Sequence, residues 1–536
     1  MNFKSLAMIA ATGLVFAACS NEDSAPVGEQ SYYGDTYAKI EINLPTTNST
    51  RASLGDYENG LEAEYNIENG YLILFAGATE PDAECVAVGT LSVGNDAVQA
   101  DKNTISNKRA ATVKFTDFNL AEAKDAGNIY GLLILNNNKI SLPSNGMKFS
   151  AWNTTTPIDA SLLNVDGPTF TMTSAPNVAQ TPTEYLQKID ASKFQNSLDD
   201  LSKVEAQKFY VQRVVAKIRM TRSNDQDGKF VVEGTENEEG TNQDYVTIND
   251  WTVDMTNQKS YPVQDVLFPS TSTVPGHFSA LVESGFSRAF WGTDPNYNKD
   301  NTVVAGDFWV ASTSDLTHHF KATPEAEADN YAYCLENTMN YDKMMQGQTT
   351  RVIIKGTYVK GEGEAKSFFK YGETIYDIDY IKSKLSSPID NLAFDEDVEG
   401  GYTNIAALFP SNKTVIASAL EIDEDATVSY YKDGACYYIV LIRHFDDSEA
   451  GLGDKQITNI SDYTEAQLGR YGVVRNNIYN VNISGVTKMG YPQIPNPTDP
   501  EDPDIDPDDP NDSQELYLKC EINVLAWANR KQDEKL

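Results

Sequence analysis

The stretch that decides the fold of this chain lies near its end and reads Leu516-Tyr517-Leu518-Lys519-Cys520-Glu521-Ile522-Asn523-Val524-Leu525-Ala526. Apolar side chains alternate here with polar or aromatic ones. Alternation with a period of two residues is typical of a β-strand that buries one face. The buried face is predicted to consist of Leu516, Leu518, Cys520, Ile522, Val524 and Ala526.

A segment near the N-terminus has the same pattern. Lys39-Ile40-Glu41-Ile42-Asn43-Leu44 aligns without a gap with Lys519-Cys520-Glu521-Ile522-Asn523-Val524. Lys, Glu, Ile and Asn are identical, and the other two positions are apolar in both. The first strand would bury Ala38, Ile40, Ile42 and Leu44. A groove that holds the first strand should therefore accept the last one; the alternative is two ordinary strands that match by chance.

A compositional break precedes the last strand. Residues 492–512 contain seven Pro and seven Asp. Proline stiffens the backbone and like charges repel, so these residues are predicted to form an extended, solvated linker before a terminal strand and tail at 513–536. The spacing of Asp502, Asp504 and Asp506 resembles a calcium loop. The glycine turn and distal Glu of such a loop are missing, so we expect no metal here.

The first residues are predicted to be a targeting segment. Residues 1–18 combine Lys4 with an apolar run from Leu6 to Ala18, which is too short to span a bilayer. Small residues directly before Cys19 resemble a bacterial lipobox, where the thiol is acylated. An ordinary signal peptide with an incidental cysteine is the alternative. A lipoprotein would be anchored by its acyl chains.

A protease-sensitive loop is predicted between the first strand and the rest of the chain. Arg51 is the first arginine of the sequence and lies among polar residues that follow Pro45. Such loops are preferred sites of proteolysis. Cleavage between Arg51 and Ala52 would release residues 19–51, which include the lipid site and the first strand. A groove with apolar walls and unpaired backbone groups would remain, ready for strand addition from another copy. A solvated surface arginine is the alternative.

Composition excludes several classes of function. The 536 residues carry a net charge of −36, which argues against binding nucleic acid. The four histidines form no His-Glu-x-x-His motif, and no nucleophile elbow, phosphate loop or Cys-x-x-Cys is present. His318-His319 lacks a nearby carboxylate motif. We therefore predict no catalytic residue, metal or cofactor. An exported chain permits disulfides among Cys85, Cys334, Cys436 and Cys520, and the sequence leaves free thiols and disulfides both open.

Strand signals dominate the rest of the chain, including Tyr71 to Ala76, Arg351 to Val359 and Ser429 to Arg443. Helices are expected only at Thr183 to Ala206 and around Ile375 to Leu385. The chain is thus predicted to be mostly β, with an N-terminal β domain at 52–209 and a C-terminal one at 210–491. The tryptophans Trp251 and Trp291 and the tyrosines of 430–438 are predicted to pack in the core, and Asp294-Pro295-Asn296 and Lys432-Asp433-Gly434 to form turns.

Several segments resemble the Bacteroidetes-type fimbrillins, the pilins of type V pili, and among them the shaft subunits of minor (short) fimbriae. They are Gln212 to Ile218, Trp251, Asn257 to Pro262, Phe290 to Tyr297, Tyr333 to Thr338, Tyr430 to Tyr438 and Val474 to Tyr479. The resemblance implies two β-sandwich-like domains of transthyretin-like architecture, few short helices and a C-terminal extended donor strand. It also implies export as a lipoprotein acylated at Cys19, cleavage at Arg51-Ala52 and polymerisation by donor-strand exchange.

We therefore expect a non-enzymatic shaft subunit of a cell-surface fimbrium that begins as an outer-membrane lipoprotein precursor. Its partners would be further copies of itself, anchor and tip or accessory pilins, an arginine-specific protease, and host or bacterial adhesion ligands. The main alternative is a surface lipoprotein that binds glycans or host proteins and never polymerises. An accessory pilin lies between these two, and a hydrolase using two carboxylates is the most distant alternative.

Overall fold

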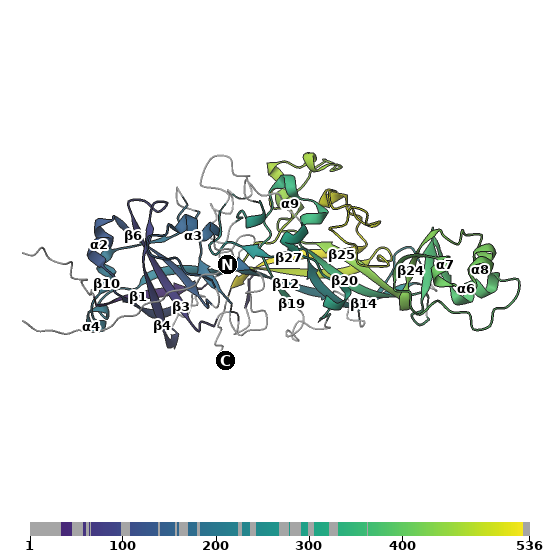
Figure 1. Cartoon of the computed structure of the whole chain (residues 1–536), viewed down its shortest axis with the longest axis horizontal. Helices are drawn as coiled ribbons and strands as arrows, with labels where there is room; N and C mark the ends of the chain where they lie inside the picture. Colours follow the sequence, from purple (N-terminus) through teal and green to yellow (C-terminus); the bar gives the residue numbers. More distant parts are fainter. Residues whose placement is uncertain are drawn as a thin grey trace, which may run out of the picture.

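The computed structural model describes residues 34–44, 57–59, 64, 66–97, 108–137, 140–155, 158–159, 170–178, 183–222, 228–235, 243–266, 278, 291–297, 305–320, 331–361 and 363–528. The molecule is elongated (Figure 1). An N-terminal β-sheet lies at one end, a pair of sheets lies in the middle, and a small sheet with helices lies at the other end. The prediction of a mostly β chain with few helices is confirmed.

The N-terminal sheet closes on itself through its first strand. Each of the seven strands of this ring pairs with the next, and the last pairs with the first. In ring order the strands are β1 (Asp35–Asn43), β11 (Gln207–Arg213), β8 (Met172–Ser174), β6 (Asn128–Leu135), β3 (Gly70–Gly77), β4 (Glu84–Ala97) and β5 (Lys108–Thr116). Two short strands, β9 (Gln187–Ile189) and β10 (Phe194–Gln195), pair with β6 and β1.

Alternate residues of every ring strand point into one hydrophobic core. Buried side chains come from β1, β3, β4, β5, β6, β8 and β11, among them Ile40, Leu74, Val113, Leu133 and Phe209. A period of two along each strand places the residues between them on the outer face of the ring. Closure of the ring leaves no free sheet edge along β1, because β1 is bonded on both sides.

The middle of the molecule is a β-sandwich. One sheet has the order β19 (Tyr331–Leu335), β12 (Val215–Arg222), β26 (Asn477–Val486), β27 (Leu518–Ala528) and β2 (Tyr57–Asn59). The other contains β13 (Lys229–Val231), β14 (Tyr245–Asp254), β20 (Arg351–Val359) and β25 (Ala435–Leu441), with β18 (His318–His319) beside β14. The fully buried Trp251, Tyr438 and Tyr479 belong to the core shared by these sheets, as the sequence predicted for the first two.

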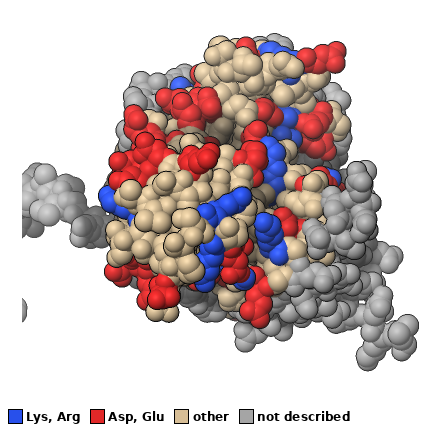
Figure 2. Space-filling model, turned by 90° about the vertical axis from the view of Figure 1, so that its right-hand side faces the viewer, with Lys and Arg blue, Asp and Glu red and all other residues tan. Residues whose placement is uncertain are grey.

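A small unit at the far end was not predicted. The strands β22 (Thr374–Asp377), β21 (Phe368–Tyr371), β24 (Thr427–Tyr431) and β23 (Gly401–Asn404) carry helices α6 (Ile378–Lys384), α7 (Ile405–Leu408) and α8 (Lys413–Leu420). Asp377 and Asn404 cap α6 and α7 with their side-chain oxygens, and Ile381, Leu408 and Ile416 help form a separate core. Acidic side chains are spread over this end face, with a few basic ones between them (Figure 2).

Two expectations about local structure differ from the structure. The helix expected at Thr183 to Ala206 is wrong: this stretch contains β9, a short 3₁₀ turn, β10 and α4 (Leu198–Leu201). Asp190 and Ser197 accept backbone hydrogen bonds there and start separate short turns, which interrupt any longer helix. The expected domain boundary between residues 209 and 210 falls inside β11, and the chain passes to the next sheet at Val214. In the part of the chain described here, no helix is long and apolar enough to cross a membrane.

Candidate assembly site: the first and last strands

The first strand, β1, is held on both of its edges. On one side it pairs antiparallel with β5 over its whole length, from Asp35 opposite Thr116 to Asn43 opposite Lys108. On the other side its second half runs parallel to β11, and its first half meets the short β10. No other strand of the ring lies between β5 and β11, so β1 alone fills the gap between them.

Burial along β1 alternates as the sequence predicted. Ile40 and Ile42 are fully buried, and Ala38 and Leu44 are nearly so. Burying an Ile or Leu side chain contributes about 1.5–3 kcal/mol. Loss of β1 would expose this core and leave backbone groups of β5 and β11 without partners, each a further cost of about 1–3 kcal/mol where water cannot replace the bond. The predicted displaced strand therefore occupies a site that needs an occupant.

The last strand, β27, lies in its own subunit's sandwich. It pairs antiparallel with β26, from Leu518 opposite Val486 to Ala526 opposite Asn477. On its other edge, among the described strands, it meets only the short parallel strand β2, at residues 526–528. The strand begins at Leu518, two residues later than predicted, and Leu516 lies before it with 64% of its surface exposed.

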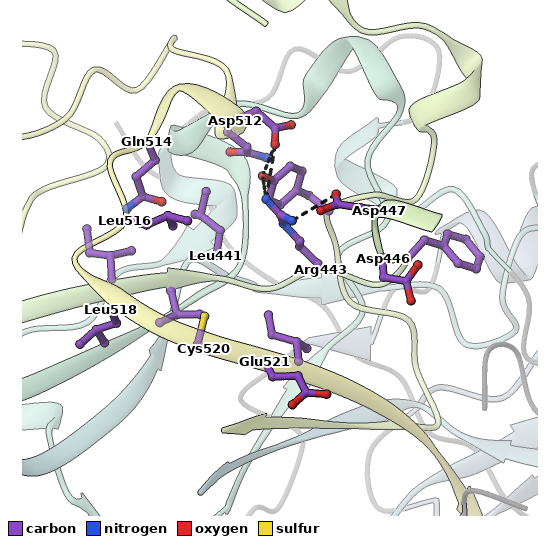
Figure 3. Close-up of a pocket in the computed structure, with 16 residues that line it drawn as sticks. Leu441, Arg443, Asp446, Asp447, Asp512, Gln514, Leu516, Leu518, Cys520 and Glu521 are labelled. Carbon is purple, nitrogen blue, oxygen red and sulfur yellow. Dashed lines mark hydrogen bonds and ion pairs between the residues drawn. The ribbon is translucent and has the colours of Figure 1, made fainter. Parts of the chain in front are cut away.

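The apolar face of β27 is less completely covered than that of β1. Leu518 and Val524 are buried, but Cys520 and Ile522 are only half-buried. A cavity of about 450 Å³ lies between this strand and β25. It is lined by Leu516, Leu518, Cys520 and Ile522 on one side and by Leu441 and Arg443 on the other (Figure 3). The last strand thus has one long partner strand and incomplete packing.

The structure extends the match between the two strands. Aligned as the sequence predicts, residues 35–44 correspond to residues 515–524, and Tyr37 corresponds to Tyr517. The ion pair that Asp35 forms with Lys114 (2.8 Å) lies at the position of Glu515. The ion pair of Glu41 with Lys108 (3.3 Å) lies at the position of Glu521, again an acid. β27 placed in this register would keep both acidic groups within reach of the same two lysines of β5, which lie diagonally across the ladder.

The linker before β27 is docked on the body, which differs from the predicted solvated spacer. The backbone N–H groups of Gln346 and Gly347 donate to the carbonyls of Asp509 and Pro507, and Ile505 is buried. Tyr402 donates to Asp504, and Asp502 accepts from the backbone N–H of Asp504. The charge repulsion expected from composition is thus offset by hydrogen bonds to carboxylates and carbonyls.

Asp512 is the centre of the strongest of these contacts. Its carboxylate accepts from Arg470 Nη2 at 2.8 Å, from Tyr463 Oη at 2.8 Å and from Tyr471 Oη at 2.9 Å. Arg443 Nη2 lies 3.4 Å away. Burial alone would raise the pKa of Asp512, but the hydrogen bonds and charge of Arg470 hold it below its usual value. Asp512, six residues before the last strand begins, is therefore held firmly in its charged form.

Most of the segments that carry the resemblance meet in one buried polar cluster between the N-terminal sheet and the sandwich. Arg475 donates to Ser260 Oγ (2.7 Å), to the Tyr261 carbonyl (2.8 Å) and to Glu336. Asp294 accepts from the backbone N–H groups of Asn296 and Thr338, and burial raises its pKa to about 8. Trp291 is fully buried, and Asp294 to Asn296 form the predicted turn. This cluster is structural, because the charged groups of Arg475 and Glu336 are paired inside it and Asp294 accepts backbone hydrogen bonds.

Other predicted sites fall into three groups. Cys19, Arg51 and Ala52 lie outside the described residues. Cys85, Cys334, Cys436 and Cys520 are free thiols, the first three of them buried. His319 Nδ1 lies 2.5 Å from an oxygen of Asp250, and no group of three possible metal ligands occurs among the described residues. The predicted turn at 432–434 is present, with Asp433 at φ 53° and Gly434 at φ 71°.

Sequence reasoning did not find the ring closure by β1, the Asp512 contacts or the pairing of β2 with β27. All three depend on contacts between segments far apart in the chain. The acids at 515 and 521 were a readable signal, since they match the acids at 35 and 41.

Comparison with known proteins gives one family match. Residues 429–533 match the family described as major fimbrial subunit protein type IV, fimbrillin, C-terminal. Among curated proteins, none matches the sequence.

Similar solved structures include a candidate cell adhesion protein of Parabacteroides distasonis, with 12% identity, a TM-score of 0.41 and coverage of 92% of this chain and 98% of that one. The C-terminally truncated tip fimbrial protein Mfa3 of Porphyromonas gingivalis has 11% identity, a TM-score of 0.31 and coverage of 92% and 100%. A fimbrial assembly protein of P. distasonis has 12% identity, a TM-score of 0.28 and coverage of 61% and 85%. These TM-scores lie below 0.5, so the family match carries more weight. The resemblance of this chain to the fimbrillins is confirmed, and it rests on the C-terminal segment 429–533, which includes the last strand.

Proposed function

We propose that this protein is a structural shaft subunit of a cell-surface fimbrium that polymerises by donor-strand exchange. In this proposal the chain is exported as a lipoprotein acylated at Cys19 and is cleaved between Arg51 and Ala52. Cleavage lets β1 leave the N-terminal ring. The last strand of another copy then fills the gap between β5 and β11.

One observation carries the proposal: the last strand matches β1 position by position. The buried Ile42 of β1 corresponds to Ile522, and the outward Glu41 corresponds to Glu521. Because side chains alternate across a strand, only an in-register exchange keeps the apolar residues inside and the acids within reach of Lys108 and Lys114. A head-to-tail contact of this kind does not close on itself, so it builds a filament.

Packing of the apolar face favours the exchanged position. In its own subunit, Ile522 is half-buried beside the cavity, whereas the corresponding Ile42 is fully buried between two strands. Completing the burial of Cys520 and Ile522 contributes on the order of 1 kcal/mol each. Two positions oppose the exchange, because Leu516 and Leu518 would replace the smaller, buried Thr36 and Ala38 and the surrounding core would have to adjust.

The deciding experiment is N-terminal sequencing of protein sheared from the cell surface, together with a gel run with and without boiling. An N-terminus at Ala52 and ladders that collapse on boiling are the expected result. A blocked Cys19 with monomer only would refute the proposal and favour an anchored surface lipoprotein that binds glycans or host proteins.

A further inference from the structure

The base of the donor strand is fixed to the body of its own subunit. Asn511 donates to Thr349 Oγ1 at 2.7 Å, and its backbone N–H donates to the Met344 carbonyl at 3.0 Å. Asp512 follows with its three short hydrogen bonds to Arg470, Tyr463 and Tyr471. Both residues are well covered, so they are the last firmly held residues before the strand.

The contacts change abruptly after Ser513. Gln514 to Tyr517 form no strand, and Leu516 exposes 64% of its surface. Glu515 forms an exposed ion pair with Lys488 at 2.9 Å, and such pairs contribute about 0–1 kcal/mol. Thr487 binds the carbonyls of Leu516 and Tyr517. The half-buried ring of Tyr517 packs against Tyr491, with ring centroids 4.8 Å apart. The remaining contacts lie on the surface and are easier to break than those of Asp512.

From these contacts we infer that Asp512 anchors the donor arm, by which we mean residues 514–528, and that the arm changes direction only within residues 514–517. The next copy of the chain then docks the open end of its groove against the surface around Asp512. This inference rests on the proposed function. Its partner is a second copy of this chain.

The short length of chain between Asp512 and the neighbour's groove determines where the two subunits touch. In the shared register Glu515 takes the position of Asp35, so only Gln514 separates Ser513 from the groove. A strand rises about 3.3 Å per residue, which places Ser513 within roughly 7 Å of the end of the neighbour's groove. The two subunits must therefore touch at this point.

The end of the groove that makes this contact is the outer end of the N-terminal sheet. The first half of β1 meets β10, and β10, α2 (Leu120–Asp125) and α4 lie together at that end of the molecule (Figure 1). Lys114 of β5 lies at the same end of the groove and faces the position of Glu515. The basic side chain on the acceptor and the acid at the base of the arm give this contact its charge complementarity.

Two disulfide locks test the inference. Met345 and Pro510 face each other in an isolated antiparallel bridge, and Asn482 and Glu521 face each other in the β26–β27 ladder. Directly opposed residues have Cα separations suited to a disulfide. We would make Met345→Cys with Pro510→Cys, and separately Asn482→Cys with Glu521→Cys, both with Cys520→Val to remove the neighbouring thiol.

The two locks have opposite expected outcomes. After cleavage by an arginine-specific protease, the oxidised lock at 345–510 should form ladders at the wild-type rate. The oxidised lock at 482–521 should stay monomeric and form ladders only after reduction. Loss of assembly in the 345–510 lock, restored by reduction, would overturn the inference and leave the proposed function intact. Failure of the wild-type and of both reduced variants to assemble would instead refute the proposed function.

Hydrogen exchange on the wild-type fimbrium gives an independent test that needs no variant. The backbone N–H groups of Gly347 and Asn511 bind Pro507 and Met344 carbonyls only while the linker is docked. These amides should remain protected in the polymer, with hydrogen-exchange rates within about threefold of those in the monomer. Loss of that protection on assembly would show that the linker peels away and would overturn the inference.

Discussion

Replacing Ile522 with Asp should stop assembly while leaving the monomer folded. In the polymer the new carboxylate would take the position of Ile42, which is fully buried between β5 and β11. Burial of an unpaired charge costs several kcal/mol, and loss of the isoleucine removes about 1.5–3 kcal/mol more. Together these exceed about 5 kcal/mol, which lowers the equilibrium constant for strand exchange more than 10³-fold, at 1.4 kcal/mol per tenfold.

The same substitution should be tolerated in the monomer. Ile522 is half-buried there and lines the cavity beside β25, where a carboxylate can reach water. The melting temperature is expected to fall by only a few degrees. Lys519→Gln is the matched control, because this exposed side chain points to the other face and forms an ion pair with Glu233. It should assemble normally.

The assay is cleavage of purified precursor by an arginine-specific protease, followed by gels without boiling and by light scattering. A milder variant, Ile522→Val, should cost about 0.5–1.5 kcal/mol and weaken assembly by up to roughly tenfold. Ladders from Ile522→Asp at the wild-type rate would refute the proposed register. So would equal assembly by all three variants.

Four further results are expected. Deleting residues 516–536 should give a monomer that cannot elongate and that melts at a lower temperature, because β27 covers part of the sandwich core; polymers from this variant would contradict donor-strand exchange. Maleimide at alkaline pH should label Cys520 slowly in the folded monomer, where the thiol is partly buried beside the cavity and burial raises its pKa, but not in the polymer. Labelling is measured by mass spectrometry, and equal labelling of the two forms would argue against exchange. Lys114→Glu should slow assembly a few-fold at low salt, and adding Glu515→Lys should restore it, since exposed ion pairs contribute about 0–1 kcal/mol; no rescue in the double variant would place the arm in another register. Burial raises the pKa of Asp294 to about 8, above its value in the unfolded chain, so its contribution to the free energy of unfolding is full at acid pH and is lost as the pH rises through 8. Between pH 5 and 9 the melting temperature of Asp294→Asn should therefore fall less than that of the wild type. Parallel curves of melting temperature against pH would show that Asp294 does not titrate in this range.

Local patterns explain what could be predicted from the sequence. The alternation of Ile40 and Ile42 with polar neighbours predicted a buried face, because burial of a strand depends on a period that can be read residue by residue. The core positions of Trp251 and Trp291 followed in the same way from their size. The match between the two terminal strands likewise needed only the two segments themselves.

The features that could not be predicted from the sequence depend on contacts between residues far apart in the chain. The ring closes because β1 meets both β5 and β11, and no local pattern states which strands are neighbours. The linker at 492–512 has the composition of a solvated spacer, yet Arg470 and the tyrosines that bind Asp512 come from another part of the chain. The separate core of the small unit was missed because its short strands and helices are interleaved in sequence.

The position of the two matched strands at opposite ends of the chain has a consequence for timing. Of the strands that the structure describes, β1 is the first to emerge during synthesis and export, and β27 is the last. In a chain that folds as it emerges, the ring closes once β11 has appeared, some 300 residues before Leu518 is available. In a newly synthesised subunit, β1 therefore occupies the groove before β27 has been made. The subunit's own last strand consequently cannot insert into its own groove.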